Sequence, residues 1–227
     1  ELSTLKRMSE VISEEISTDC AGNNHPVAVL LGPSHAEEVA FGQPSAVVLA
    51  GSGQIWHHWQ KLLSSKRFRV YTNEDITGVE ISSAFKNVLA IATGISDGLG
   101  YGDNTRGALL TRGLTELSLL GNELGGKQET FYGLAGIGDI ITTCTSVHSR
   151  NRNFGEAFVK ENLSPTDILN RSVQIVEGVV MTEAAMKYGN AHNLELPISN
   201  EVYNMLFKGK DPELALTDLM DRTLRAE

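Results

Sequence analysis

The sequence of 227 residues predicts an α/β layer followed by an all-helical domain. Up to residue 73, short apolar runs alternate with helical patterns, which is typical of an α/β sheet. Beyond residue 75, every periodic segment has the spacing of an amphipathic helix. We therefore predict one domain over residues 1–75 and a second over residues 76–227.

In the first domain, apolar residues at helical spacing predict an amphipathic helix over residues 1–18. The continuous apolar run 27–32 predicts a strand buried on both faces of a parallel sheet. A short helix follows, and Ser34 and Glu37 have the spacing of a capping box at its start. A second strand, a helix and a third strand are expected at 45–50, 53–65 and 68–73.

The second domain contains several signals for helix starts. Thr77 and Glu80 have the spacing of a capping box. Ser149 is a candidate N-cap for a helix that begins at residue 150. Prolines at the first helical position predict two more starts, at Ser164-Pro165 and Asp211-Pro212.

Composition excludes several classes of function. A net charge of −9 and a pI near 5.2 argue against nucleic acid as a partner, because the phosphate backbone would be repelled. No segment is apolar enough for integral membrane contact. The two cysteines, Cys20 and Cys144, fit neither a metal site nor a disulfide framework, which favours a reducing cytoplasm.

Lys86 stands in an otherwise apolar helical pattern. Small or polar residues lie on its own helix face, whereas bulky apolar residues lie on the other. This pattern indicates a cleft in which the ammonium group has a use. The alternative is a solvated lysine whose stem covers apolar surface, and for an isolated lysine that alternative is the more common case.

A second polar stretch, residues 132–158, is suited to an anion. Glycines lead to Asp139, and hydroxyl side chains follow before Arg150-Asn151-Arg152 at a predicted helix start. Hydrogen-bond donors, a helix N-terminus and a guanidinium group are what a phosphate needs. The glycines do not follow a buried strand, so they are not read as a nucleotide loop. The alternative is a solvated basic helix start.

Several long blocks resemble the bacterial glycerol-3-phosphate dehydrogenase [NAD(P)+] family, and the resemblance extends from the first residues to about residue 220. They are "GPSHAEEVA", "ISSAFKNVLAIATGISDGLGYGDNTRGALLTRGLTEL", "GLAGIGDIITTC", "SRNRNFG", "VEGVVMTEAA" and "LELPISNEVYNML". The resemblance implies the C-terminal part of a Rossmann domain followed by a helical domain similar to that of 6-phosphogluconate dehydrogenases. It implies interconversion of sn-glycerol 3-phosphate and dihydroxyacetone phosphate with NAD or NADP, for phospholipid synthesis, and a possible homodimer.

The family resemblance also assigns roles to individual residues. Lys86 is implied as the catalytic acid/base, with Asp139 able to orient it and Asn87 and Thr143 as supports. Glu177 is equally well read as a helix-cap or surface carboxylate. The substrate-binding residues implied are Gly32, Ser34, Lys86, Asp139, Ser149, Arg150 and Asn151. The cofactor-binding residues implied are Ala36, Arg150, Ile175 and Glu177.

The family's glycine-rich fingerprint is missing from this sequence, which also opens without a methionine. We therefore expect a fragment that lacks the N-terminal part of the Rossmann domain and is nearly inactive alone. The choice between NAD and NADP is not readable. Two alternatives are a related two-domain hydroxy-acid dehydrogenase and a non-catalytic helical assembly module.

Two further features are read as structural. The stretch "WHHWQ" at 56–60 is expected on a surface helix, because His57 and His58 are adjacent and face different directions. Cys144 is expected to be a packed thiol, because hydride transfer needs neither a nucleophile nor a metal.

Overall fold

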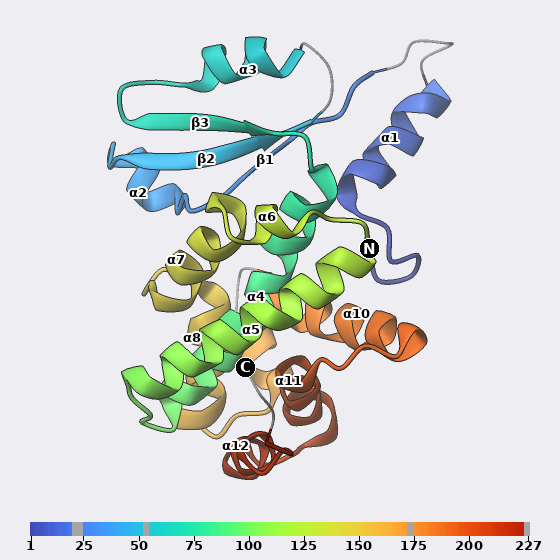
Figure 1. Ribbon diagram of the computed structural model, residues 1–227. Coiled ribbons are helices and arrows are strands. Elements are labelled where there is room, and N and C mark those ends of the chain that lie inside the picture. The colour runs from blue at the N-terminus through green and yellow to red at the C-terminus, as the bar shows by residue number, and fades with distance from the viewer. Residues whose placement is uncertain (20–24, 52–54, 172–174, 225–227) are drawn as a thin grey trace.

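The computed structural model describes residues 1–19, 25–51, 55–171 and 175–224, and it places a small sheet at one end of a helical body (Figure 1). The predicted order, an α/β layer and then helices, is confirmed. The first part contains α1 (Met8–Asp19), β1 (Val29–Leu31), α2 (Ala36–Ala40), β2 (Ser45–Ala50), α3 (Ile55–Leu63) and β3 (Phe68–Asn73). The second contains α4 (Ile76–Gly98), α5 (Asp103–Glu123), α6 (Gln128–Phe131), the π-helical turn η1 (Leu134–Gly138), α7 (Asp139–Thr145), α8 (Arg150–Lys160), α9 (Pro165–Arg171), α10 (Glu177–His192), α11 (Pro197–Lys208) and α12 (Pro212–Met220).

The sheet has the strand order β1-β2-β3 and apolar layers on both faces. β2 and β3 run parallel, with Val47 opposite Val70. Because side chains alternate along a strand, Val47 and Leu49 pack toward α3, whereas Val48 packs toward the first turn of α4. Both strands lie where the sequence predicts them.

The prediction for the first strand is wrong in its length and in its pairing. β1 spans three residues rather than 27–32, and it pairs antiparallel to β2, with Leu30 opposite Leu49. Val29 and Leu31 pack in the core, whereas Leu30 is 39% exposed. An apolar run does not distinguish the direction of pairing, and β1 is the outermost described strand on its side.

The predicted helix over residues 1–18 begins only at Met8. The Glu1 carboxylate accepts bonds from the backbone N–H groups of Ser3 and Thr4, which folds the preceding segment into a turn. Glu80 of α4 then accepts bonds from the Ser9 backbone N–H at 2.9 Å and from the Ser9 hydroxyl at 2.6 Å. Glu80 therefore secures the start of α1 against α4.

Both predicted capping boxes are wrong. α2 begins after His35 without a side-chain cap, and the Ser34 hydroxyl donates to the Gly32 carbonyl instead. α4 is capped by Asp75, whose carboxylate accepts from the Gly78 N–H at 2.7 Å. The other Asp75 oxygen accepts from the Thr130 hydroxyl at 2.7 Å, so this residue also holds the α6 region.

The other predicted helix starts are confirmed. The Ser149 hydroxyl accepts from the Arg152 N–H at the start of α8. The Asp211 carboxylate caps α12, and prolines occupy the first positions of α9 and α12. No helix in the described ranges is long and apolar enough to cross a bilayer.

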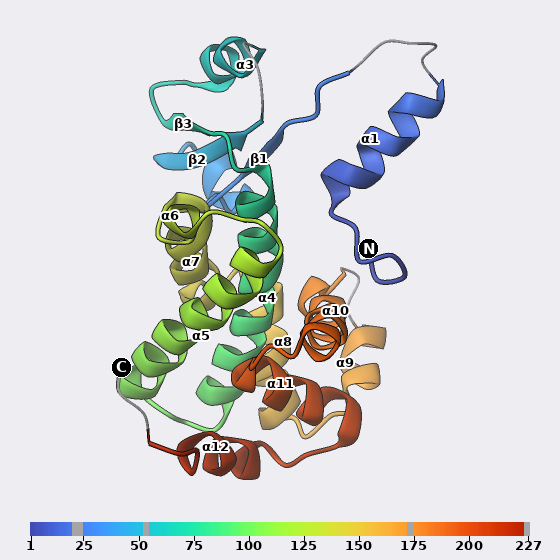
Figure 2. The ribbon, with the colours of Figure 1, turned by 45° about the vertical axis from the view of Figure 1, so that its right-hand side comes forward.

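Helix α4 is the centre of the helical body, with α5, α8 and α10 around it (Figure 2). Phe85, Leu89 and Ile91 are fully buried along it. Two glycines let α8 approach closely: a Cβ on Gly94 would lie 1.9 Å from the Arg152 carbonyl oxygen, and one on Gly155 would lie 2.2 Å from the Ile91 carbonyl oxygen. The two helices are therefore in backbone contact.

Glu116 of α5 is a buried carboxylate that secures the start of α11. It accepts bonds from the backbone N–H groups of Ile198 and Ser199 and from the Ser199 hydroxyl. Burial raises the pKa of Glu116 to about 7, against the opposing effect of these three donors.

Gly94→Ala is expected to destabilise the fold, because the new methyl group would meet the α8 backbone, which cannot rotate away. Overpacking of this kind costs about 1–3 kcal/mol, measurable by urea unfolding. Gly107→Ala is the matched control, because a Cβ there meets nothing within 4 Å and alanine favours the helix. Equal stability of the two variants would contradict the close contact.

Glu116→Gln is expected to flatten the pH dependence of stability between about pH 4.5 and 7. The native pKa is above the unfolded value, so the native state binds more protons in this range, and the free energy of unfolding of the wild type falls as pH rises. Urea unfolding at pH 5, 6 and 7 measures this slope. The exposed Glu213→Gln serves as control, and a slope in Glu116→Gln as steep as in the wild type would refute the assignment.

Candidate functional site

An ion pair between α4 and α7 forms the centre of the candidate site. The Nζ atom of Lys86 lies 2.5 Å from Oδ2 of Asp139, and their side chains are 18% and 3% exposed. The other oxygen of Asp139 accepts from the Thr143 hydroxyl at 3.3 Å. Asp139 therefore orients the amine and balances its charge, while the amine stays in partial contact with solvent.

Two hydroxyl side chains near Lys86 on α4 already have hydrogen-bond partners in the same helix. The Ser82 hydroxyl donates to the Gly78 carbonyl, and the Thr93 hydroxyl donates to the Leu89 carbonyl. Both hydroxyls are bonded within their own helix and are fully buried. These two hydroxyls are therefore not available to a ligand, whereas the side chain of Lys86 is partly exposed.

A buried amide network next to Lys86 joins α4, α8 and α10. The Asn151 side chain donates to Oδ1 of Asn87 at 2.9 Å and accepts from the Gly178 N–H at 2.9 Å. The Asn87 amide donates to Oε2 of Glu177 at 3.3 Å. Because Asn87 and Asn151 are 4% and 6% exposed, these bonds fix both side chains.

Arg150, the first residue of α8, is held by weaker contacts and remains 47% exposed. Its Nη1 donates to the Ile175 carbonyl at 3.2 Å, and its Nη2 lies 3.8 Å from Oε1 of Glu177. The Ser149 hydroxyl accepts from the Arg152 N–H and can still donate its own proton. The structure thus brings Arg150, Ile175 and Glu177 together beside a helix N-terminus, where an anion is favoured.

Arg152 does not join this group, although the sequence groups it with Arg150. Its guanidinium pairs with Asp97 of α4, which also receives Arg106 of α5. Asp97 is a residue that the sequence analysis missed. A signal existed, because Asp97 follows Lys86 by eleven residues, about three helical turns, and therefore lies on the same face of α4.

The turn that contains Gly32, Ser34 and Ala36 lies beside the site without a described contact to Lys86 or Arg150. Gly32 has a φ of +139°, which favours glycine, and the Ser34 hydroxyl bonds within the turn. A Cβ on Gly138 would lie 3.9 Å from Pro33, which places the turn next to the start of α7. The His35 and His148 rings are 6.0 Å apart across the same gap.

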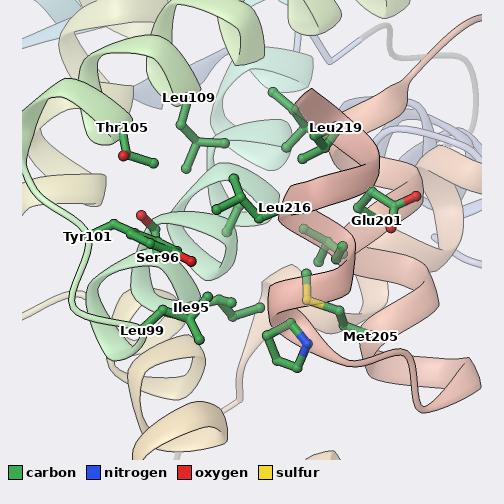
Figure 3. Close-up of a pocket in the computed structure, with 15 residues that line it drawn as sticks. Ile95, Ser96, Leu99, Tyr101, Thr105, Leu109, Glu201, Met205, Leu216 and Leu219 are labelled. Atoms are coloured by element: carbon green, nitrogen blue, oxygen red, sulfur yellow. The ribbon is translucent and has the colours of Figure 1, made fainter. Parts of the chain in front are cut away.

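Cavities lie on both sides of α4 in the described part of the chain. One of about 490 Å³ opens between the first residues, β1, α4 and α10, and Ser83 and Glu177 line it. A smaller one of about 60 Å³ lies between α4, α5, α11 and α12, with Leu99, Leu109 and Met205 around it (Figure 3). Of these two cavities, the larger adjoins the candidate site, through Glu177.

The cavity of about 490 Å³ lies next to the start of α10, and its volume is in the range of small-molecule binding sites. Glu177 faces it, and the carbonyl of the neighbouring Ile175 holds Arg150. The glycine-rich turn "GLAGIG" forms η1 between the helices α6 and α7. It does not follow a strand, which agrees with the prediction that it is not a nucleotide-binding loop.

The two features read as structural agree with the fold. His57 and His58 are exposed on α3, which confirms the predicted surface helix. Cys144 is fully buried, and burial raises the pKa of its thiol to about 12, so it is a packed thiol. Cys20 lies outside the described residues.

A parallel strand pair with helices on both faces, joined to a helical body that presents a lysine–carboxylate pair and an anion-suited helix start, is the arrangement of the two-domain dehydrogenases. Sequence comparison identifies the member of that class. Residues 75–217 match the family described as "NAD-dependent glycerol-3-phosphate dehydrogenase C-terminus", and residues 1–56 match the corresponding N-terminus. The chain belongs to the NAD-dependent glycerol-3-phosphate dehydrogenase family.

Individual relatives agree with this assignment. The chain is 46% identical to a glycerol-3-phosphate dehydrogenase [NAD(P)+] of Shouchella clausii over its whole length and 66% of that protein. A glycerol-3-phosphate dehydrogenase [NAD(P)+] from Thermotoga is 47% identical to this chain, which covers 68% of the length of that relative. The crystal structure of glycerol-3-phosphate dehydrogenase from Coxiella burnetii superimposes with a TM-score of 0.89 at 42% identity, covering 97% of this chain and 66% of that one. The chain thus spans about two thirds of the length of these relatives.

Proposed function

We propose that the protein catalyses the NAD(P)-dependent interconversion of sn-glycerol 3-phosphate and dihydroxyacetone phosphate, as a step toward glycerophospholipids. The observation that carries the proposal is the Lys86–Asp139 pair beside the start of α8. Family membership and relatives named glycerol-3-phosphate dehydrogenase support it.

Lys86 acts as the acid/base at the C2 oxygen. In oxidation, its amine removes the hydroxyl proton, and in reduction, its ammonium returns a proton to the developing alkoxide. The buried Asp139 carboxylate holds the amine in one orientation throughout, and Thr143 holds the carboxylate. When bound, the nicotinamide supplies the other half of the chemistry by accepting or donating the hydride at C2.

The substrate phosphate binds at the start of α8. Arg150 supplies a guanidinium fork, the Ser149 hydroxyl supplies a proton, and the helix N-terminus favours negative charge. Asn151 positions this turn through Asn87, next to Lys86. The turn with Gly32 and Ser34 closes the site from the sheet side.

Of the cofactor contacts proposed for this chain, Glu177 lines the larger cavity. Glu177 and Ile175 would hold one side of the dinucleotide, Arg150 would approach it, and Ala36 would lie near the nicotinamide. A location in the cytoplasm, a homodimer and the absence of nucleic acid as a partner remain predictions from the sequence. So does the preference for a phosphorylated substrate over another hydroxy acid.

Lys86→Ala in the full-length protein is expected to lower kcat by about 10²–10⁴-fold, because the proton acceptor is lost. The loss must be separated from the cost of leaving Asp139 buried without a partner. The double variant Lys86→Ala/Asp139→Asn removes both charges, and it should recover stability but not kcat. Cofactor oxidation with dihydroxyacetone phosphate measures kcat, and recovery of turnover in the double variant would eliminate the acid/base role.

Arg150→Ala is expected to raise KM for dihydroxyacetone phosphate by about 10- to 100-fold, since a charged hydrogen bond contributes about 1.5–3 kcal/mol. KM measured at saturating reduced cofactor checks this. Arg171→Ala is the control, because Arg171 forms an exposed pair with Glu161 at 3.2 Å. An unchanged KM in Arg150→Ala would show that Arg150 does not bind the substrate phosphate.

A further inference from the structure

Asp97, near the end of α4, receives guanidinium groups from two other helices. Its Oδ2 accepts from Nε of Arg152 at 2.8 Å and lies 2.6 Å from Nη2 of the same residue. Its Oδ1 accepts from Nη2 of Arg106 at 2.7 Å. The side chains of Asp97 and Arg152 are only 8% and 15% exposed. One carboxylate therefore joins α4, α5 and α8.

The Asp97–Arg152 contact differs from the exposed Asp103–Arg106 ion pair beside it. One hydrogen bond and a second close contact join the Arg152 guanidinium to Oδ2 of Asp97, and both side chains are largely shielded from water. Removing one partner would leave the other charge uncompensated. Asp103 also lies 2.7 Å from Arg106, but its side chain is 96% exposed, so that pair contributes little.

Arg152 is held at three points in the first turn of α8. Its guanidinium binds Asp97, its N–H donates to the Ser149 hydroxyl, and its carbonyl oxygen lies against Gly94. Ser149, Arg150 and Asn151 precede it directly, so any shift of Arg152 moves the proposed phosphate-binding turn.

Next to Asp97, on another side of α4, the apolar packing leaves a small cavity. Ser96 and Leu99 line the cavity of about 60 Å³ together with Thr105 of α5 (Figure 3). The Ser96 hydroxyl is buried without a described hydrogen-bond partner. The ion pairs of Asp97 are thus a main polar restraint on the end of α4.

We propose that Asp97 is a positioning residue for substrate binding: through Arg152 it sets the place of Arg150 and Asn151 relative to Lys86. This inference rests on the proposed function. Asp97 acts from the far end of the same α4 face that carries Lys86, so the proton-transfer group and the phosphate-binding turn share one rigid support.

Asp97→Asn in the full-length protein tests the proposal. KM for dihydroxyacetone phosphate should rise by about 10-fold or more, with kcat changed much less. Asp97→Glu, which keeps the carboxylate, should recover part of the loss. The matched control is Asp103→Asn, which removes a carboxylate from the same Arg106 and should leave KM unchanged. If Asp97→Asn does not fold, Arg152→Lys retains the charge without the fork and should raise KM in the same way.

A lower melting temperature with an unchanged KM would show that Asp97 only stabilises the fold, and the proposal would be wrong. An equal rise of KM in Asp103→Asn would also overturn it. A wild-type protein inactive toward dihydroxyacetone phosphate would contradict the proposed function instead. In that case calorimetry with inorganic phosphate decides, because Asp97→Asn should still weaken phosphate binding about 10-fold, and equal binding would refute the positioning role.

Discussion

The backbone contact between α4 and α8 is the constraint on which the rest of the helical body depends. Gly94 and Gly155 remove the side chains that would hold the two helices apart. Close approach then brings Asn87 within 2.9 Å of Asn151, and Asn151 in turn accepts from the start of α10. Gly178 allows the same close approach between α10 and α4, because a Cβ there would lie 2.7 Å from the Asn87 carbonyl oxygen. Three helices from distant parts of the sequence therefore meet at side chains too short to tolerate a wider spacing.

Much of this could be predicted from local signals. β2 and β3 follow from continuous apolar runs, and α8, α9 and α12 follow from a serine cap and from prolines at first helical positions. Lys86 and Asp139 were singled out as a charged residue in an apolar pattern and a carboxylate after glycines. These signals work because each depends on neighbours in the chain, or on the cost of burying a charge, and neither requires the tertiary structure.

Most of the wrong predictions have one cause: the residue interacts with a partner that is distant in the sequence. Glu80 was assigned to a cap on its own helix, but it binds Ser9, 71 residues away. Asp75 caps α4 with one carboxylate oxygen, while its second oxygen accepts from Thr130, 55 residues away. Arg152 was grouped with Arg150 by adjacency, although successive helical residues face different directions. The antiparallel pairing of β1 is likewise decided by the sheet, since its own residues are compatible with either direction.

The charges on this side of the helical body are arranged unevenly, and the unevenness supports the proposed phosphate site at Arg150. Lys86 is paired at 2.5 Å with a carboxylate that is 3% exposed, and Arg152 at 2.6 Å with one that is 8% exposed. Arg150 instead lies 3.8 Å from Glu177, whose side chain is 60% exposed. A dianionic substrate would displace that weak contact at small cost, because exposed ion pairs contribute little. In the proposed function, the well-paired cations Lys86 and Arg152 define the geometry of the site, and the poorly paired Arg150 supplies the charge that a phosphate needs.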